Sequence, residues 1–326
     1  MTVLVTGASG YLGRAVAAEL LAAGHDVRTL QRRPSGAAGA VDTLGSVTDR
    51  ATVERAVGGA DAVVHLAAKV SLAGEAAEFR AINVDGTRTL LDAAERAGVT
   101  RFVQVSSPSV AHAGAALAGV GAEPASPEHA RGEYARTKAE AELLALARDG
   151  VSGMRVVAVR PHLVWGPGDT QLVERIVERA RRGTLPLLNG GTALIDTTYV
   201  DNAATGIVAA LHRADMAHGN AYVLTNGEPR PVGDLLGGIC RAAGVPAPRV
   251  SVPAALGRIA GAAVEWVWTV RPGVDEPPMT RFLAEQLSTA HWFDQRSTRR
   301  DLDWAPTVSI DEGLRRLAKH YGTGSD

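Results

Sequence analysis

The stretch EYARTKAE (133–140) carries a tyrosine and a lysine four residues apart, Tyr134 and Lys138. On a helix, residues at this spacing project from the same face, so the two side chains would lie together. A free tyrosine has a pKa of about 10 and transfers protons poorly at neutral pH. A neighbouring ammonium stabilises the phenolate, so we expect Lys138 to lower the pKa of Tyr134 towards neutrality. The pair would then act as an acid–base catalyst.

Two consecutive serines, Ser106 and Ser107, end the apolar run RFVQVSS (101–107) upstream of this pair. If the run is a strand, a hydroxyl at its carboxyl end can donate a hydrogen bond to a substrate oxygen that gains charge. A tyrosine and a lysine at this spacing also occur on exposed helices that have no function. The serines make the catalytic interpretation more specific.

Glycines punctuate the segment TGASGYLG (6–13), where Gly7, Gly10 and Gly13 are three residues apart. The segment lies between an apolar run at 3–5, expected to be a strand, and a helical pattern at 14–24. Glycine lets the backbone turn sharply and approach a pyrophosphate, to which the helix N-terminus offers N–H groups and a positive dipole. Glycines also mark ordinary tight turns, but the strand before and the helix after favour dinucleotide binding.

The end of the next expected strand bears on the choice of dinucleotide. NAD-binding proteins usually carry Asp or Glu there to hold the ribose hydroxyls. Here Gln31 takes that place, followed by Arg32 and Arg33. No acid would repel a 2′-phosphate, and two guanidinium groups could bind one, so we favour NADP(H) over NAD(H). The alternative is that the arginines belong to a solvated turn.

Alternating strand and helix patterns position these residues. We expect strands at 3–5, 26–30, 61–68, 101–107 and 154–161, and helices at 14–24, 51–60, 83–98 and 133–150. The strands are continuous apolar runs, as expected when helices cover both faces of a parallel sheet. The fold class is therefore α/β, a doubly wound parallel sheet of the Rossmann type with a smaller C-terminal substrate-binding cap.

Glycine and proline cluster after Pro161, and a helix is expected at 171–183. We expect a dinucleotide-binding domain over 1–165, to which the chain returns around 196–213, and a cap formed mainly by 166–326. Residues 111–132 are expected to form a long loop beside Tyr134, a candidate lid.

Composition excludes several classes of function. A net charge of −1 gives no basic field for nucleic acid, and an aromatic content of 4% argues against base stacking along a single strand. The single cysteine, Cys240, suits a cytoplasmic protein. No metal-binding motif occurs, and no signal-like segment opens the chain. Residues 254–270 are apolar but interrupted by charges, which favours a buried or interfacial helix over a membrane span and leaves peripheral membrane contact open.

Together these motifs resemble the extended short-chain dehydrogenase/reductase family across essentially the whole chain. The resemblance is carried by TGASGYLG, HLAA (65–68), NVDGT (83–87), SSPSV (106–110), YARTK (134–138), RPHLVWGPGD (160–169) and YVDN (199–202). It implies an NAD(P)-dependent oxidoreductase with Ser107, Tyr134 and Lys138 as its catalytic residues. The family usually has Asp where Ser46 stands.

The resemblance also implies which residues line the cofactor. From the glycine-rich turn and the end of the second strand they are Gly7, Ser9, Gly10, Tyr11, Leu12, Gly13, Arg32 and Arg33. From later segments they are Ser46, Val47, Leu66, Ala67, Ala68, Lys69, Asn83, Ser106, Tyr134, Lys138, Pro161, His162 and Leu163. His162 would orient the cofactor amide or a substrate carboxylate, or else be a structural residue.

The segment SSPSVAHAG (106–114) resembles the 3β-hydroxysteroid dehydrogenase branch. The segment RPHLVWGPGD (160–169) and the tail at 280–317 resemble 2-alkyl-3-oxoalkanoate reductases of olefin or β-lactone biosynthesis. This implies NADPH-dependent reduction of a ketone in lipid metabolism, with Trp266 and Trp268 either lining an apolar pocket or forming cap core. The competing hypotheses are a 3β-hydroxysteroid dehydrogenase, a sugar-nucleotide epimerase or dehydratase, and a non-catalytic NADP sensor. Relatives pair through the helices expected here at 84–97 and 134–148, which implies a homodimer.

Overall fold

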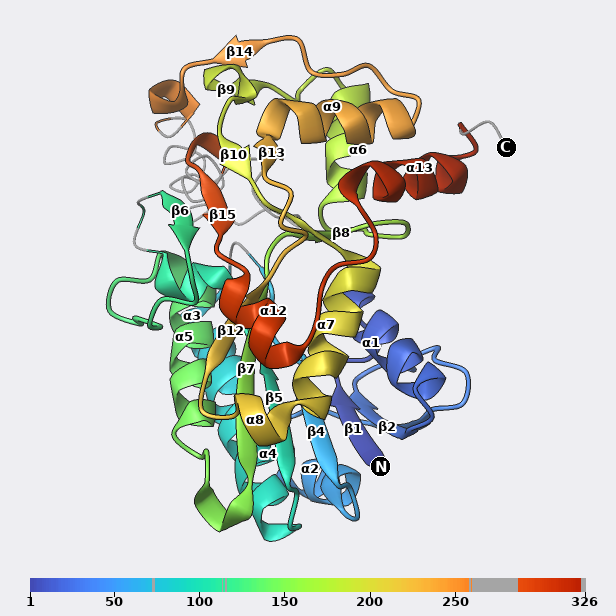
Figure 1. Cartoon of the computed structure of the whole chain (residues 1–326), viewed down its shortest axis with the longest axis vertical. Helices are drawn as coiled ribbons and strands as arrows, with labels where there is room; N and C mark the ends of the chain where they lie inside the picture. The colour runs from blue at the N-terminus through green and yellow to red at the C-terminus, as the bar shows by residue number, and fades with distance from the viewer. Residues whose placement is uncertain (72–73, 113, 115, 258, 260–286, 324–326) are drawn as a thin grey trace.

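The protein, seen in a computed structural model that describes residues 1–71, 74–112, 114, 116–257, 259 and 287–323, is built on a parallel sheet. Its strand order is β12-β7-β5-β4-β1-β2-β3 (Figure 1). The strands are β1 Thr2–Thr6, β2 Asp26–Gln31, β3 Val41–Leu44, β4 Ala62–His65, β5 Arg101–Val105, β7 Arg155–Pro161 and β12 Ala221–Leu224. The order reverses between β1 and β4, and ligands bind outside the carboxyl ends at such a point. The predicted doubly wound α/β fold is confirmed.

Helices cover both faces of this sheet. On one face, Val3 and Val5 of β1 pack with α1 and α7, while on the other Leu4 packs with α2, α4 and α5. Because successive strand residues point to opposite faces, both sets must be apolar, which explains the unbroken apolar runs. The helices are α1 Tyr11–Ala22, α2 Arg50–Val57, α4 Gly86–Arg96, α5 Gly132–Leu146 and α7 Val200–His212.

Short elements connect these layers. Before α4 the chain forms α3 and then a π-helical turn, η1, so the helix expected at 83–98 is continuous with residues further upstream. The connecting elements are α3 Ala76–Phe79, η1 Arg80–Asp85, the 3₁₀ turns η2 Pro108–Ala111, η3 Val151–Gly153 and η4 Asn189–Gly191, and the helices α8 Ala214–Ala217 and α12 Arg296–Leu302.

A second apolar cluster lies beyond the carboxyl edge of the sheet, in the upper part of Figure 1. It packs α6 Val173–Arg181, α9 Val232–Ala242 and α13 Ile310–Tyr321 together. Three small sheets flank this cluster in the described part of the chain. The first has four strands, β13 Arg230–Pro231, β10 Leu194–Ile195, β15 His291–Phe293 and β6 Leu117–Val120. The other two have two strands each: β11 Thr198–Tyr199 pairs with β8 Val164–Trp165, and β14 Ser251–Val252 pairs with β9 Leu187–Leu188. The boundary expected near residue 165 stays a prediction. The large sheet also includes β12, which lies beyond the expected return at 196–213.

The segment 111–132, expected to be a long loop, contains a strand. This strand is β6, which pairs with β15 near the far end of the chain. Its few residues gain backbone partners only through this long-range pairing, so no local pattern marks them as a strand. The helix expected at 254–270 falls mostly outside the described residues, as do Trp266 and Trp268. Within the described part of the chain, no helix is long and apolar enough to cross a membrane.

Candidate active site

The glycine-rich turn between β1 and α1 forms a cradle that only glycine fits. A Cβ on Gly13 would lie 2.2 Å from the carbonyl oxygen of Gly7. Gly7 has a φ of +77°, and a Cβ there would lie 2.8 Å from the backbone nitrogen of Ala67. Gly13 therefore lets α1 pack onto the turn, and Gly7 lets the turn approach the loop after β4.

The N-terminus of α1 is open towards this cradle. Gly10 is its N-cap residue and, having no side chain, leaves the first N–H groups without a side-chain cap. Such N–H groups and the helix dipole suit an anionic phosphate. The backbone here therefore fits the pyrophosphate of a dinucleotide, with Ser9, Tyr11 and Leu12 at the same turn. The Tyr11 hydroxyl is turned towards Gly166, and burial raises its pKa far above the ordinary value.

The carboxyl end of β2 carries the two arginines. Arg32 and Arg33 are both exposed just beyond the strand, whereas Gln31 is buried and donates a hydrogen bond to Thr29 Oγ1 at 2.9 Å. Neither guanidinium forms an ion pair within the described part of the chain. The exposed groups beyond this strand end are therefore two guanidiniums, while the nearby Asp42 carboxylate accepts hydrogen bonds from Thr29 and Ser35.

The residues expected along the adenine lie after β3. Ser46 Oγ and Thr48 Oγ1 share a hydrogen bond of 2.8 Å. Val47 is buried, and a Cβ on Gly86 of α4 would lie 2.8 Å from its Cγ2. Val47 thus packs this turn against α4, while Ser46 is partly exposed and its hydroxyl bonds within the same loop.

The loop after β4, Leu66–Lys69, is held by two polar residues. Thr6 Oγ1 accepts from the backbone N–H of Ala67 at 3.1 Å. Asn83 accepts from the Lys69 N–H at 2.7 Å through Oδ1, and its Nδ2 donates to the Lys69 carbonyl at 3.2 Å and to Thr137 Oγ1 at 3.0 Å. Asn83 therefore ties this loop to α5, the helix that carries the Tyr/Lys pair.

The structure brings Ser107, Tyr134 and Lys138 together. Ser107 follows β5 and caps η2, where its Oγ accepts from Ser109 N at 3.3 Å and from Ser109 Oγ at 3.0 Å. The Tyr134 side chain is hydrogen-bonded to Ser107. Lys138 lies one turn further along α5, is only 4% exposed, and donates from Nζ to the carbonyl of Val105 at 2.6 Å.

The expected lowering of the tyrosine pKa is wrong for this structure. Burial raises the pKa of Tyr134 to about 12, and the hydrogen bond with Ser107 opposes this only in part. Burial also lowers the pKa of Lys138 to about 8, against the influence of Glu142. The reason is that desolvation acts on both groups and that the lysine is directed at a backbone carbonyl. At neutral pH the tyrosine is thus protonated and the lysine is mostly charged.

The segment after β7 adjoins the serines. Ser106 N donates to Val159 O at 2.7 Å, which places Ser106 beside the end of β7, where Pro161, His162 and Leu163 follow. His162 is buried, its Nδ1 lies 2.6 Å from the Asp196 carbonyl, and burial lowers its pKa to about 4. His162 is therefore neutral at pH 7.

Two polar groups under the site were not singled out from the sequence. His65 has Nδ1 2.6 Å from Thr6 Oγ1 and Nε2 2.9 Å from Thr87 Oγ1, and burial lowers its pKa to about 3. Glu142, on α5, pairs with Arg160 of β7. Polar residues in otherwise apolar strands were the available signal, because a buried strand seldom carries them without partners.

Metal ligands were not expected from the sequence. The described residues contain no group of three His, Cys, Asp or Glu side chains placed to hold a metal ion. The absence of a metal role stays a prediction.

Comparisons with known proteins agree with this arrangement. A family model described as the NAD dependent epimerase/dehydratase family matches residues 3–225. A 2-alkyl-3-oxoalkanoate reductase from Stenotrophomonas maltophilia (strain K279a) is 40% identical, over 97% of this chain and 98% of its own. A protein of the same name from Shewanella oneidensis is 34% identical, over 96% and 84%. A 3 beta-hydroxysteroid dehydrogenase/Delta 5→4-isomerase from Mycobacterium tuberculosis is 34% identical, over 98% and 90%.

Solved structures share the fold. A short-chain dehydrogenase/reductase superfamily protein from Agrobacterium tumefaciens, with bound NAD, superposes with a TM-score of 0.74 at 25% identity, covering 98% of this chain and 97% of that one. A UDP-glucose 4-epimerase from Thermotoga maritima gives 0.73 at 21% identity over 99% of both chains, a likeness of fold alone.

The chain belongs to the NAD dependent epimerase/dehydratase family, that is, to the extended short-chain dehydrogenases/reductases. Its relatives are named as reductases and dehydrogenases, and the protein is an oxidoreductase of this family. The resemblance predicted from the motifs is confirmed.

Proposed function

We propose that the protein is an NADPH-dependent reductase that converts the 3-ketone of 2-alkyl-3-oxoalkanoic acids into a hydroxyl group. The observation that carries the proposal is a protonated Tyr134 hydrogen-bonded to Ser107, with Lys138 one turn behind it. The substrate class is supported by two relatives of that name, at 40% and 34% identity over nearly the whole chain.

In this proposal, bound NADPH would supply the hydride that adds to the carbonyl carbon. Ser107 donates a hydrogen bond to the carbonyl oxygen, and Tyr134 transfers its hydroxyl proton to that oxygen. The product is an alcohol, and the tyrosine is left as a phenolate. The Lys138 ammonium stabilises this phenolate until solvent returns a proton.

The protonation state of Tyr134 is the one that reduction requires. A reductase needs a proton donor at this position, whereas an alcohol dehydrogenase needs a base. Burial raises the pKa of Tyr134 to about 12, so the hydroxyl carries its proton at neutral pH, as a free tyrosine also does, and in this proposal Lys138 must stabilise the phenolate for the transfer to proceed.

The preference for NADPH is supported by Arg32 and Arg33. Both are exposed at the end of β2, and no carboxylate replaces Gln31 to hold a ribose 2′-hydroxyl. Charge-assisted hydrogen bonds from guanidinium to phosphate are among the strong ones, so a 2′-phosphate gains more here than a hydroxyl does.

The test is NADPH oxidation, followed at the nicotinamide absorbance, with a 2-alkyl-3-oxo fatty acid or a stable ketone analogue. We expect Tyr134→Phe to lower kcat by about a hundredfold to ten-thousandfold, since it removes the general acid, with NADPH binding retained. Tyr321→Phe on α13 makes the same chemical change away from the site and serves as the control. Undiminished turnover in Tyr134→Phe would refute the assignment.

A second candidate is a 3β-hydroxysteroid dehydrogenase, because the Mycobacterium tuberculosis relative is 34% identical over 98% of this chain. Oxidation of a 3β-hydroxysteroid with NAD or NADP, with no turnover of 3-oxo fatty acids, would favour it. A sugar-nucleotide epimerase would instead retain its dinucleotide and convert a sugar nucleotide without net oxidation. A sensor would bind NADPH without turnover.

We also propose a cytoplasmic homodimer that pairs through α4 and α5. Leu143 on α5 is 43% exposed, although most leucines of the described chain are covered, and a partner helix would bury it. Light scattering at micromolar concentration tests this, and a monomer there would count against it.

A further inference from the structure

The face of α5 that is turned to the sheet carries an ion pair as well as the Tyr/Lys pair. Glu142 follows Lys138 by four residues, so the two side chains lie one turn apart on the same face. Arg160 of β7 meets Glu142 through two nitrogens, with Nε 2.9 Å from Oε2 and Nη2 bonded to Oε1. The two side chains are only 2% and 1% exposed.

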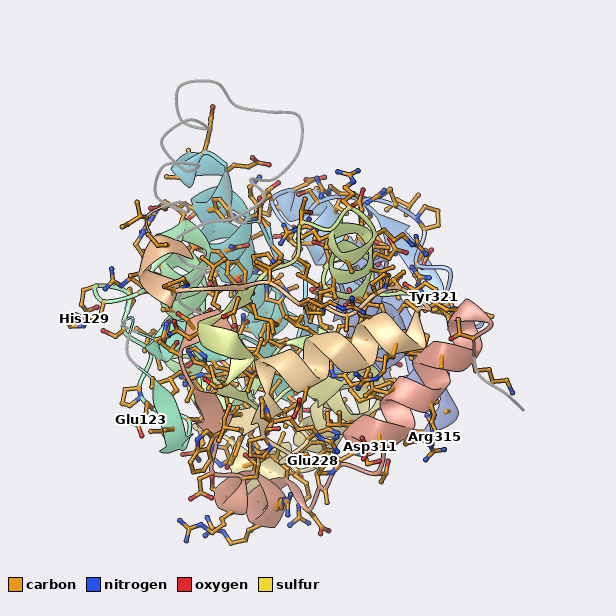
Figure 2. The ribbon with its side chains drawn as sticks, turned by 90° about the horizontal axis from the view of Figure 1, so that it is seen from above. Glu123, His129, Glu228, Asp311, Arg315 and Tyr321 are labelled. Atoms are coloured by element: carbon orange, nitrogen blue, oxygen red, sulfur yellow. The ribbon has the colours of Figure 1, made fainter. Side chains whose placement is uncertain are left out.

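Arg160 also reaches a third segment. Its Nη1 donates to the backbone carbonyl of Glu123 at 2.7 Å. In the view from above, Glu123 and His129 lie on the same side of the molecule, in the segment that joins β6 to α5 (Figure 2). One guanidinium therefore links β7, α5 and the segment that leads into the catalytic helix.

Such a pair is hard to explain by stability alone. Removing two charges from water costs several kcal/mol for each ion, and well-packed apolar residues of similar volume often stabilise a fold as well or better. All five hydrogens of the guanidinium fork need acceptors in this dry environment, and the pair uses only some of them.

Lys138 has few charged neighbours besides Glu142. Its own helix offers Tyr134, which is neutral, and Glu140, which is turned outward to Arg136 and Arg80. The ionisable side chains on the neighbouring elements are either neutral or paired with another residue. His65 of β4 is neutral, and Arg160 of β7 pairs with Glu142. The carboxylates of α3 and α4 are paired as well: Glu78 with Lys69, and Asp92 and Glu95 with Arg148. Asp85 of η1 makes no ion pair within the described part of the chain. Glu142, although paired with Arg160, lies one turn behind Lys138 on the same face and raises the lysine pKa against the effect of burial.

We propose that Glu142 and Arg160 are positioning residues for Lys138: Arg160 fixes the Glu142 carboxylate one turn behind the lysine, and this carboxylate keeps the buried amine charged. The proposal rests on the role given to Lys138 in the proposed function, where only the ammonium form stabilises the tyrosine phenolate. It assigns to the pair an electrostatic role in the reaction, beyond the packing of α5.

The chain allows a test that needs neither substrate nor cofactor. It contains only three lysines, Lys69, Lys138 and Lys319. Protein grown with lysine labelled with ¹³C at Cε gives one NMR signal for each, and the shift of each signal follows the charge on its Nζ. Variants Lys69→Arg and Lys319→Arg assign the signals, and a pH titration then reports the charge of Lys138 directly.

We expect Glu142→Gln to move the Lys138 midpoint down by about one pH unit, because an opposite charge at close range is worth about that much. In Glu142→Gln the unpaired Arg160 guanidinium would also lower the midpoint, so Glu142→Gln/Arg160→Gln, in which neither charge remains, decides between the two roles. There a purely structural role predicts the opposite direction. Loosening of α5 would admit water, and the midpoint would rise towards the ordinary value for lysine. Glu140→Gln makes the same change of charge two residues away on the outward side and should leave the midpoint in place.

The double variant Glu142→Gln/Arg160→Gln also serves if Glu142→Gln does not fold, because its amides can bond to each other and leave no charge buried. The lysine midpoint should again fall. An unchanged or raised midpoint in a folded variant would overturn the proposal, whatever the enzyme's substrate proves to be. With the proposed ketone substrate, the alkaline fall in kcat should move to lower pH in Glu142→Gln and stay in place in Glu140→Gln. Activity that is absent from the start would instead count against the proposed function.

Discussion

The proposed cofactor-binding end and the proposed catalytic end of the same sheet edge differ in the chemical groups that form them. At β1 and α1 the site consists of backbone: glycines at fixed spacing, an uncapped helix N-terminus, and a close approach to the next loop. Around β4, β5, β7 and α5 it consists of buried side chains. Lys138 donates to a carbonyl, Glu142 pairs with Arg160, and His65 lies between two threonines.

One end of the site therefore depends on the shape of its backbone, and the other depends on the charges of its side chains. A backbone cradle either has room for a pyrophosphate or lacks it, and solution conditions change it little. A cluster of buried ionisable groups works only in one set of protonation states, which desolvation and neighbouring charges decide together. The first end should therefore respond to added atoms, and the second to pH and to single charges.

The most severe way to break the backbone end is Gly13→Ala. The added Cβ would lie 2.2 Å from the Gly7 oxygen, so the turn must shift, which costs about 1–3 kcal/mol and displaces the phosphate site. We expect NADPH affinity to fall at least about tenfold by fluorescence titration. Gly58→Ala, where the nearest atom would be 3.5 Å away, is the control. Equal affinity in wild type and Gly13→Ala would show that the cradle does not bind the cofactor.

A smaller effect is expected at the end of β2, where Arg32 and Arg33 should make the protein bind NADPH more tightly than NADH. Replacing Arg32 and Arg33 together by serine should weaken NADPH about tenfold, as expected for the loss of charge-assisted contacts at an exposed site, and leave NADH nearly unchanged. The ratio of the two dissociation constants is the measurement. Parallel weakening of both would mean that the arginines do not contact a 2′-phosphate.

The end with the buried ionisable side chains should make the stability of the fold depend on pH. Burial lowers the pKa of His65 to about 3 and of His162 to about 4, whereas in the unfolded chain each takes up a proton near 6.5. Below pH 6.5 the unfolded state thus binds more protons, and stability falls with acid, by about 2 kcal/mol for each histidine at pH 5. Asp196, whose pKa burial raises to about 6, acts in the opposite sense below that pH.

Single variants isolate the histidine contribution. His162→Asn keeps a donor for the Asp196 carbonyl but cannot be charged, so its thermal midpoint should fall less than that of wild type between pH 7 and 5. The exposed His129→Asn is the control (Figure 2). Identical acid sensitivity in wild type and His162→Asn would mean that the ring is not kept neutral by burial.

Much of the fold and the site could be predicted from the sequence because the relevant signals are local. Apolar runs alternating with helical patterns indicated the central sheet, and Gly7, Gly10 and Gly13 marked the cradle, since their spacing follows from one turn of chain. The order of Ser107, Tyr134 and Lys138 was informative for the same reason, as each occupies a defined place on a strand end or helix.

What local pattern could not give is burial and long-range pairing. The pKa of Tyr134 depends on how much protein encloses it, and a spacing of four residues contains no such information. Glu142 and Arg160 are 18 residues apart, and nothing in either segment shows that they meet in a dry layer. Strand β6 is similarly defined only by its partner.

The pairing of β6 with β15 also bears on how the chain folds as it is made. Leu117 of β6 pairs with His291 of β15, so the segment that follows Ser107 gains its backbone partners from the last tenth or so of the chain. Contacts closed over such long loops form late and slowly. During synthesis the nucleotide cradle can form while the ribosome is still far from the end, but the segment beside Ser107 must wait until residue 293 has emerged. A chain shortened before β15 would lack this pairing, and it would also lose Leu302 and Trp304 from the core that β1 and α1 share.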